Sequence, residues 1–314
     1  MIKIHFINVG HGDCIVIEFC DKSRIAVVDI NMSKEMDNDS QSEVLNELNS
    51  YDKNHYQSLN FSNSQIFEKA GYNINLTNPI DYIKQLTNGS IFRFISTHPH
   101  LDHLSGLSEL KSRVGILNYW VVNNKLLVNS SNLSNSQNED WTLYKKLRDT
   151  TERIQDGITI VKPKEGSKNQ YWIEDNITIL SPNNKLVKLA EETNRPNIMS
   201  YVLLINYAGH KIILGGDAED ETWEYIYKNH SDLIKDVTIL KASHHGRNSG
   251  YYQSAIELMK PKYTIVSVGK KPDTDASNKY RNYCENVLST RWMGNIVFEI
   301  HSKGEIKYYC EHNR

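Results

Sequence analysis

Hydrophobic and polar positions alternate from the first residues of the chain, as they do in strands that bury one face. The alternation predicts strands over residues 2–6, 14–19 and 24–30, with a glycine-containing turn over residues 10–13 between the first two. Later apolar segments predict strands over residues 91–96, 115–122, 158–161, 177–180, 201–206, 211–214, 237–241 and 263–268. A closing hairpin ends the chain.

Helical periodicity and capping residues separate these strands. They predict helices over residues 78–86, 104–110, 140–154, 219–228, 251–259 and 278–288. Two polar segments interrupt the order, and we interpret residues 32–76 and 123–170 as insertions. The first is expected to hold one or two short helices, and residues 123–139 are expected to form a loop. Two groups of strands with helices between them indicate one α/β sandwich domain over residues 1–314, with helical layers outside.

Composition narrows the class of protein. The chain of 314 residues is 39% hydrophobic and has a formal net charge of −2, so it has no global basic field. No apolar run is long enough to cross a bilayer, and the first residues lack a secretory signal. We therefore expect a cytoplasmic protein that does not bind membranes, with reduced thiols. Basic residues outnumber acidic ones between Lys241 and Arg291, which favours an anionic substrate.

The strongest chemical pattern is the segment 97–103, Thr-His-Pro-His-Leu-Asp-His, directly after an apolar strand. Three imidazoles and a carboxylate in six residues are costly unless something binds them. Imidazole and carboxylate are the usual ligands of zinc-like ions. His98 and His100 can hold one ion because alternate residues of an extended turn point the same way. Asp102 and His103 can hold a second.

Two more polar clusters follow predicted strands. Asp217 follows two glycines, where the backbone can approach a ligand closely, and its carboxylate could bridge two ions. His244 and His245 follow the strand over residues 237–241. Adjacent side chains point in different directions, so we expect only one of them to be a ligand. Loops that follow strands at one sheet edge converge on a site, which places the three clusters together.

With these clusters, the chain resembles metallo-β-lactamase-fold hydrolases, and in particular the hydrolase domains of ComEC-type competence DNA-uptake proteins. The resemblance is carried by residues 6–13, 28–29, 98–106, 197–204, 214–217, 240–246 and 261–269, in family order across nearly the whole chain. It implies an αββα sandwich with a dinuclear metal site at its edge.

The resemblance also assigns roles residue by residue. It implies this ligand set: His98 and His100 for the first ion, Asp102, His103 and His244 for the second, and Asp217 as the bridge. His244 is preferred to His245 because it occupies the place of the family's last ligand. Asp29 and Asp13 are expected to orient the ligands from outside the set.

Several positions depart from the family pattern. Many relatives supply a third histidine to the first ion, whereas this chain has Asn197 and Ser200 in that region. The glutamine usual in the opening turn is His11 here. These positions are treated as substituted or supporting residues.

The expected activity is metal-dependent hydrolysis with one or two Zn²⁺ ions, or Mn²⁺, and a metal-activated water. Asp102 is expected to orient that water, and Lys241 and His245 to neutralise a phosphate. A phosphodiester in a nucleic acid or nucleotide-like molecule is the leading substrate. A carboxylic ester, lactone or amide is the alternative, and a binding or regulatory module with a degenerate site is a second. In that last case the insertions would contact a protein partner.

Overall fold

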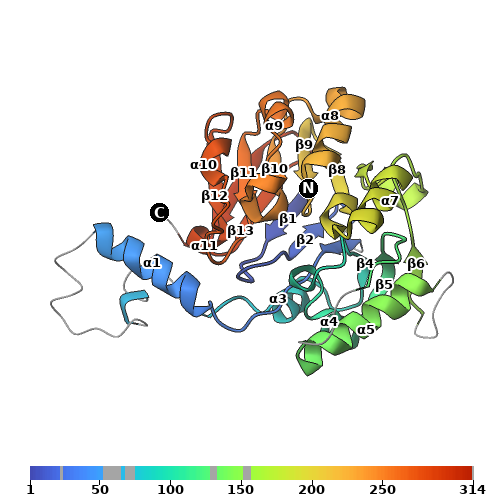
Figure 1. The fold of residues 1–314 in the computed structure, drawn as a ribbon, viewed down its shortest axis with the longest axis horizontal. Coiled ribbons are helices and arrows are strands. Elements are labelled where there is room, and N and C mark those ends of the chain that lie inside the picture. Colours follow the sequence, from blue (N-terminus) through green and yellow to red (C-terminus); the bar gives the residue numbers. More distant parts are fainter. Residues whose placement is uncertain (22–23, 52–64, 68–74, 128–132, 151–156, 313–314) are drawn as a thin grey trace.

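The computed structural model describes residues 1–21, 24–51, 65–67, 75–127, 133–150 and 157–312 (Figure 1). Its strands form two sheets. The larger sheet has the order β14-β13-β1-β2-β3-β4-β5-β6, with bounds Ile306–Cys310, Ile296–Ile300, Ile2–Phe6, Ile15–Glu18, Ile25–Val28, Ile91–Ile95, Ile116–Trp120 and Thr159–Val161. The smaller has the order β12-β11-β10-β9-β8-β7, with bounds Asn286–Ser289, Tyr263–Val266, Ile239–Lys241, His210–Leu214, Val202–Tyr207 and Ile177–Ser181.

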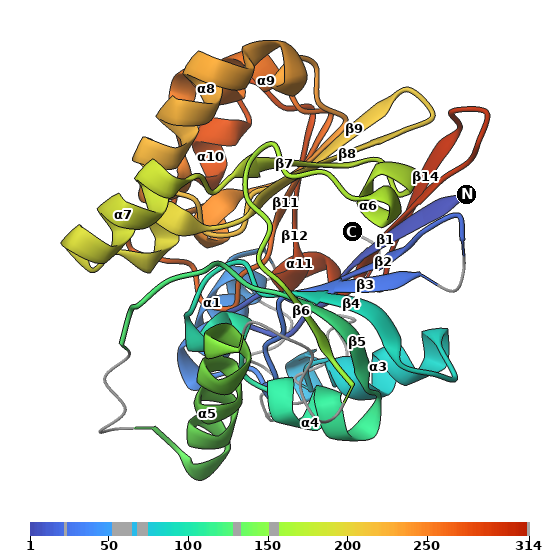
Figure 2. The same ribbon diagram turned by 90° about the vertical axis from the view of Figure 1, so that its right-hand side faces the viewer.

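Helices cover the outer faces of both sheets (Figure 2). Those on the larger sheet are α3 (Pro79–Leu86), α4 (Leu107–Arg113) and α5 (Asn135–Asp149); those on the smaller are α8 (Asp220–Ile234), α9 (Gln253–Met259) and α10 (Ser277–Tyr280). The other helices are α1 (Asn38–Tyr51), α6 (Gln170–Glu174), α7 (Asn184–Thr193) and α11 (Thr290–Met293). Side chains from both sheets share one buried core, and each outer face has its own. The molecule is therefore the expected αββα sandwich.

Strand direction brings the ends of both sheets to one edge. Strands β3 to β6 run parallel to one another, as do β9 to β12. Strand β7 is antiparallel to β8, which is antiparallel to β9, so β7 runs the same way as β9. The Tyr201 N–H donates to the Thr97 carbonyl at 3.1 Å, which ties the start of β8 to the end of β4. The carboxyl ends of these strands thus share an edge, called the carboxyl edge below.

One predicted helix is wrong. Residues 278–288 form only the single turn of α10, and then β12 pairs in parallel with β11. Leu288 is buried in the core between the sheets. Pairing and burial therefore outweigh the weak helical pattern of this segment.

Other boundaries shift for local reasons. Helix α5 begins at Asn135, because Ser134 and Gln137 form a capping box, so the loop expected over residues 123–139 is wrong in its last part. Gly106, with φ +103°, delays α4 to Leu107. Helices α6 and α7 were not predicted. In the first insertion α1 is longer than expected, and most of residues 52–74 lie outside the described part.

The turn between β1 and β2 packs tightly against the loop after β4. The Asp13 N–H donates to the Asp102 carbonyl at 3.1 Å. Gly12 has φ +146°, and a Cβ there would lie 2.5 Å from the Asp102 carbonyl oxygen and 2.6 Å from Asn31 Cβ. Glycine at this position therefore lets the turn reach the loop.

We predict that Gly12→Ala lowers the free energy of unfolding by about 2–4 kcal/mol, through overpacking against backbone and left-handed strain. The matched control is Gly209→Ala in the β8–β9 turn, where φ is +83° and a Cβ would meet nothing within 4 Å. Strain alone should cost the control about 1–2 kcal/mol. Urea denaturation measures both variants. Equal losses would show that the close approach to Asp102 and Asn31 contributes nothing.

Candidate metal centre

The three polar clusters meet at the carboxyl edge. The loop after β4 carries His98 and His100 and continues into the 3₁₀ turn η2 (Leu101–His103). Asp217 follows β9, and the 3₁₀ turn η4 (Ser243–Gly246) follows β10. Each cluster begins where a buried strand ends, so the sandwich itself brings them together.

The carboxylate of Asp217 lies at the centre of this group. Its Oδ2 is 3.2 Å from His103 Nε2, 3.5 Å from His245 Nε2 and 3.8 Å from His98 Nε2. Asp102 Oδ2 lies 3.2 Å from His245 Nε2 and 3.9 Å from His103 Nε2. Ligand atoms of Asp102, His103, Asp217 and His245 all lie within 4.8 Å of one another, so one ion could contact all four.

Asp29 orients His98 and His103 through hydrogen bonds on the side away from Asp217. Its Oδ2 accepts a hydrogen bond from His103 Nδ1 at 2.7 Å and from the Thr97 hydroxyl at 2.6 Å. The Thr97 oxygen in turn lies 3.0 Å from His98 Nδ1. With both Nδ1 atoms engaged, the Nε2 atoms of His98 and His103 face Asp217, as metal-binding histidines require. Asp29 therefore lies where it can hold both imidazoles, one of them through Thr97.

The two adjacent histidines of η4 take places opposite to those expected. His245 is buried, and its Nδ1 donates to the Ser267 carbonyl at 2.9 Å, which aims Nε2 at the two carboxylates. His244 points elsewhere. Its Nδ1 lies 2.7 Å from the Ser249 hydroxyl and its Nε2 lies 3.4 Å from Asn197 Nδ2. The geometry thus favours His245 over His244 among the ligands.

Lys241 and Asp13 lie on the buried side of the cluster. The Lys241 ammonium is fully buried, ion-pairs with Asp13 Oδ2 and lies 3.7 Å from Asp217 Oδ1. This placement is at odds with the expected contact between Lys241 and a substrate phosphate, because the ammonium has no exposed surface. Asp13 Oδ2 also lies 3.7 Å from His103 Nδ1. Both residues neutralise and support their neighbours, as expected for Asp13.

The donors expected for a first ion also converge. His98 Nε2 lies 3.1 Å from His100 Nδ1, and both are close to Asp217. Asn197 and Ser200 are buried nearby, where Ser200 packs under Gly216. Among the described residues, Asn197 Oδ1 and Ser200 Oγ have no hydrogen-bond partner. Two neutral oxygens thus lie buried beside the histidines and Asp217.

Without a bound metal ion, protonated histidines balance the negative charge of the buried carboxylates. Burial opposes protonation of His103, but Asp217 and Asp29 outweigh it and raise its pKa well above the ordinary value. Burial also opposes protonation of His245, and Asp217 and Asp102 raise its pKa. Burial alone would raise the pKa of Asp217, but His103 and His245 hold it well below its usual range. A divalent cation can replace these protons.

Two observations fit a metal. Within the described residues, His103 Nε2 and Asp217 Oδ1 are buried and have no hydrogen bond of acceptable geometry. Burial lowers the pKa of His98 and of His100, so these imidazoles are neutral and available as ligands. The donor set of imidazole nitrogens and carboxylate oxygens suits zinc-like ions.

The mouth of the site is lined by more exposed groups. The side chain of Asp102 is 31% exposed, whereas Asp217 and His245 are each 1% exposed. The His11 ring lies 4.6 Å from that of His245, and Arg247 lies 3.5 Å from His11 Nε2. Burial, with the neighbouring His245, lowers the pKa of His11 to about 4, so this imidazole is neutral.

Backbone strain accompanies the site. Asp29, His244 and His245 have φ values of 57°, 51° and 54°, a left-handed conformation that non-glycine residues adopt rarely. Such conformations persist where surrounding contacts impose them and cluster at functional sites. Contacts within the site therefore hold the backbone of these two turns in the left-handed conformation.

Sequence reasoning missed three supporting groups. Thr97 relays Asp29 to His98, and the Ser267 carbonyl orients His245. Glu219 accepts a hydrogen bond from Asn197 at 3.2 Å and lies 3.6 Å from His244 Nδ1. In the sequence, only position points to two of them. Thr97 opens the segment 97–103, and Glu219 lies two residues after Asp217.

Comparisons of sequence with known proteins match only part of the chain. No protein-family model matches. ComE operon protein 3 of Bacillus subtilis (strain 168) is 29% identical over 156 residues, which cover 49% of this chain and 18% of that protein. This chain thus spans less than a fifth of the length of that relative.

Two solved structures illustrate the likeness in three dimensions. Igni18, a metallo hydrolase from Ignicoccus hospitalis, has 12% identity and a TM-score of 0.48, covering 98% of both chains. The metallo-β-lactamase fold protein YhfI from Bacillus subtilis has 10% identity and a TM-score of 0.44, covering 98% of this chain and 100% of its own.

In the described residues, no helix is long and apolar enough to cross a membrane. The chain forms an αββα sandwich with a histidine and carboxylate cluster at its carboxyl edge, and its sequence resembles that of ComE operon protein 3 over about half of its length.

Proposed function

We propose that this protein is a metal-dependent hydrolase that cleaves phosphodiester bonds, with Zn²⁺ or Mn²⁺ at the site around Asp217. The observation that carries the proposal is the convergence of three imidazole nitrogens on one buried carboxylate oxygen, with a second, more exposed carboxylate beside them. His98, His100 and Asp217 would hold one ion, and Asp102, His103, His245 and Asp217 a second. When bound, such ions lower the pKa of water and polarise a phosphoryl oxygen.

The chain's own residues supply the remaining steps. Asp102 is the exposed carboxylate of the cluster and can accept a hydrogen bond from a water at the mouth, which orients that water for attack. Asp29, through Thr97 and directly, holds the imidazoles of His98 and His103 in one tautomer. The Lys241 ammonium pairs with Asp13 and lies 3.7 Å from Asp217 Oδ1, so it offsets part of their negative charge within the core.

A phosphodiester is favoured over a neutral ester or lactone by the groups at the mouth. The Arg247 guanidinium beside His11 is a fixed positive charge next to the cluster. Guanidinium matches the geometry of a phosphate and gains less from an uncharged carbonyl substrate. His244, held by Ser249, offers a further imidazole on the same side.

The activity itself gives a first prediction. Protein loaded with Mn²⁺ or Zn²⁺ should hydrolyse bis-p-nitrophenyl phosphate, and His100→Ala should lower kcat by at least ~100-fold, because an ion that loses a ligand no longer activates water. The control is His301→Ala, which removes a histidine beyond the end of β13 at the opposite edge. Release of p-nitrophenolate measures both. Absence of phosphodiester turnover at full metal occupancy would reject the proposal, and turnover of lactones or β-lactams instead would support the alternative substrate class.

The arrangement of η4 gives a second prediction. His245→Ala should weaken binding of one metal ion by at least about tenfold, since its Nε2 faces both carboxylates. His244→Ala should keep the metal content of the unmodified protein and lose turnover only. Elemental analysis after dialysis against a weak chelator measures the ions held per chain. The assignment fails if His244→Ala loses an ion while His245→Ala keeps both.

A further inference from the structure

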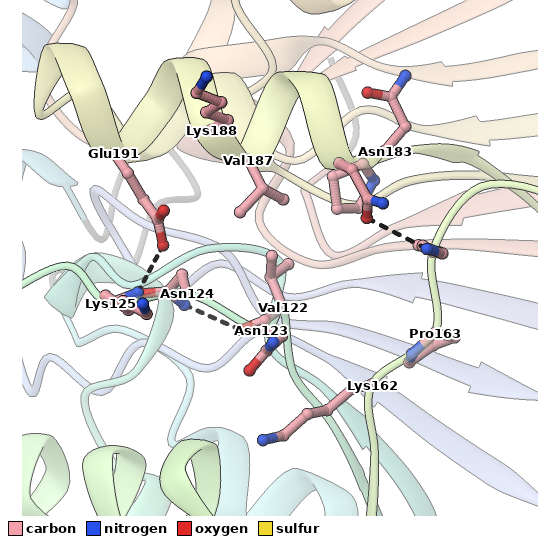
Figure 3. Close-up of a pocket in the computed structure, with 13 residues that line it drawn as sticks. Val122, Asn123, Asn124, Lys125, Lys162, Pro163, Asn183, Val187, Lys188 and Glu191 are labelled. Atoms are coloured by element: carbon pink, nitrogen blue, oxygen red, sulfur yellow. Dashed lines mark hydrogen bonds between the residues drawn. The ribbon is translucent and has the colours of Figure 1, made fainter.

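A second feature of the carboxyl edge lies apart from the metal centre. A cavity of about 420 Å³ opens between the segments that follow β5 and β6 and the first turns of α7 (Figure 3). Four lysines line it: Lys125, Lys162, Lys164 and Lys188. We call this cavity the lysine pocket.

The positive charge of the lysine pocket is poorly balanced. Its one lining carboxylate, Glu191, accepts the backbone N–H of Lys125 at 2.7 Å. Among the described residues, the ammonium groups of Lys125 and Lys162 have no ion pair within 4.0 Å, while Lys164 donates to the Asn184 amide. Partial burial lowers the pKa of Lys162. Lys188 pairs with Glu192 at 3.5 Å, and the Asp149 carboxylate attracts the Lys162 ammonium from a longer distance. An anion entering here would still meet two ammonium groups, those of Lys125 and Lys162, that form no ion pair within the described part of the chain.

The lysine pocket and the metal centre share one edge and one rigid frame. Strands β4, β5 and β6 are parallel neighbours, so the ends of β4 and β6 lie about 10 Å apart at two strand spacings. Tyr201 joins the two places. Its hydroxyl lies 2.7 Å from the Pro163 carbonyl and 3.1 Å from the Val121 carbonyl, and its N–H binds the Thr97 carbonyl beside the metal ligands.

The walls of the pocket contain more than charge. Val122, Pro163 and Val187 offer apolar surface in the pocket, and Figure 3 shows Val187 extending from α7 toward Val122, with Pro163 on the neighbouring segment beside Lys162. Ammonium groups bind phosphate as point charges, and the apolar walls can cover a sugar or base. A nucleotide has both parts, whereas an acidic peptide has only carboxylates on short stems.

We propose that the lysine pocket binds a phosphate group of a polynucleotide strand, and that another phosphodiester of the same strand lies at the metal centre. This inference rests on the proposed function, because it places the remainder of the same substrate. A ligand with phosphates at both places must carry them about 10 Å apart, which a polynucleotide can do and a diester with a single phosphate cannot. The pocket would thus select a polymer over a small diester.

The test compares two double variants with the unmodified protein. Lys125→Gln/Lys162→Gln removes the two unpaired charges of the pocket. Lys235→Gln/Lys303→Gln is the matched control, since it removes two exposed lysines near the opposite edge, before β10 and after β13. Metal-loaded protein binds a labelled single-stranded oligonucleotide with phosphorothioate linkages, which resist cleavage, and fluorescence anisotropy is measured over a salt series.

The pocket variant should bind the oligonucleotide about tenfold or more weakly, as expected when charge-assisted hydrogen bonds to phosphate are removed. Its slope of log K against log salt should become shallower by about 0.7 for each phosphate that the lysines no longer neutralise. The control should match the unmodified protein, and kcat/KM for bis-p-nitrophenyl phosphate should stay unchanged in both variants.

Three results would overturn the inference: no oligonucleotide binding by the unmodified protein, equal affinity and salt slope in the pocket variant, or lysine-dependent binding of poly-glutamate as tight as that of the oligonucleotide. The binding measurement needs no turnover. A protein that binds the strand through these lysines but cleaves no phosphodiester would support the pocket and reject the proposed catalysis.

Discussion

The carboxylate of Asp217, buried among three imidazoles, is the interaction on which the rest of the site depends. A buried charge is costly unless partners surround it. Here His98, His103 and His245 lie within 3.8 Å of one oxygen, and Lys241 lies 3.7 Å from the other. The two sheets supply these partners from separate strand ends. The sandwich and the charged cluster therefore stabilise each other: the strands position the charges, and the charges fix the loops.

Much of this could be predicted from sequence because the information is local. Strand alternation is a local pattern, and the sheets contain every strand that the alternation indicated before β12. The cluster at residues 98–103 is compact in sequence, so its chemistry is visible there. The position of Asp29 at a strand end, and that of Asp217 after two glycines, also placed them at the same edge as the cluster.

The rest depended on contacts between distant residues. Residues 286–289 become a strand only because β11 offers an edge, which no local pattern reveals. His244 and His245 are indistinguishable in sequence, since their directions follow from left-handed backbone at both positions and from the Ser267 carbonyl. The burial of Lys241 could not be predicted either, because its ammonium pairs with Asp13, which lies far away in the turn between β1 and β2.

The basic side chains show most clearly that sequence alone does not reveal contacts between distant residues. The basic excess between Lys241 and Arg291 suggested an anionic substrate, yet both of these residues ion-pair with carboxylates of distant segments. Lys125 and Lys162, which form no ion pair within 4.0 Å among the described residues, both come from the polar segment 123–170 that we interpreted as an insertion, and only the parallel order of β5 and β6 brings them together. The sequence gives the number of charged residues. A binding surface, however, depends on which of these charges remain unpaired at the same sheet edge as the metal centre. In the proposed complex, the lysine pocket accordingly supplies counter-charge to the part of an extended anion that lies beyond Arg247 and the metal centre.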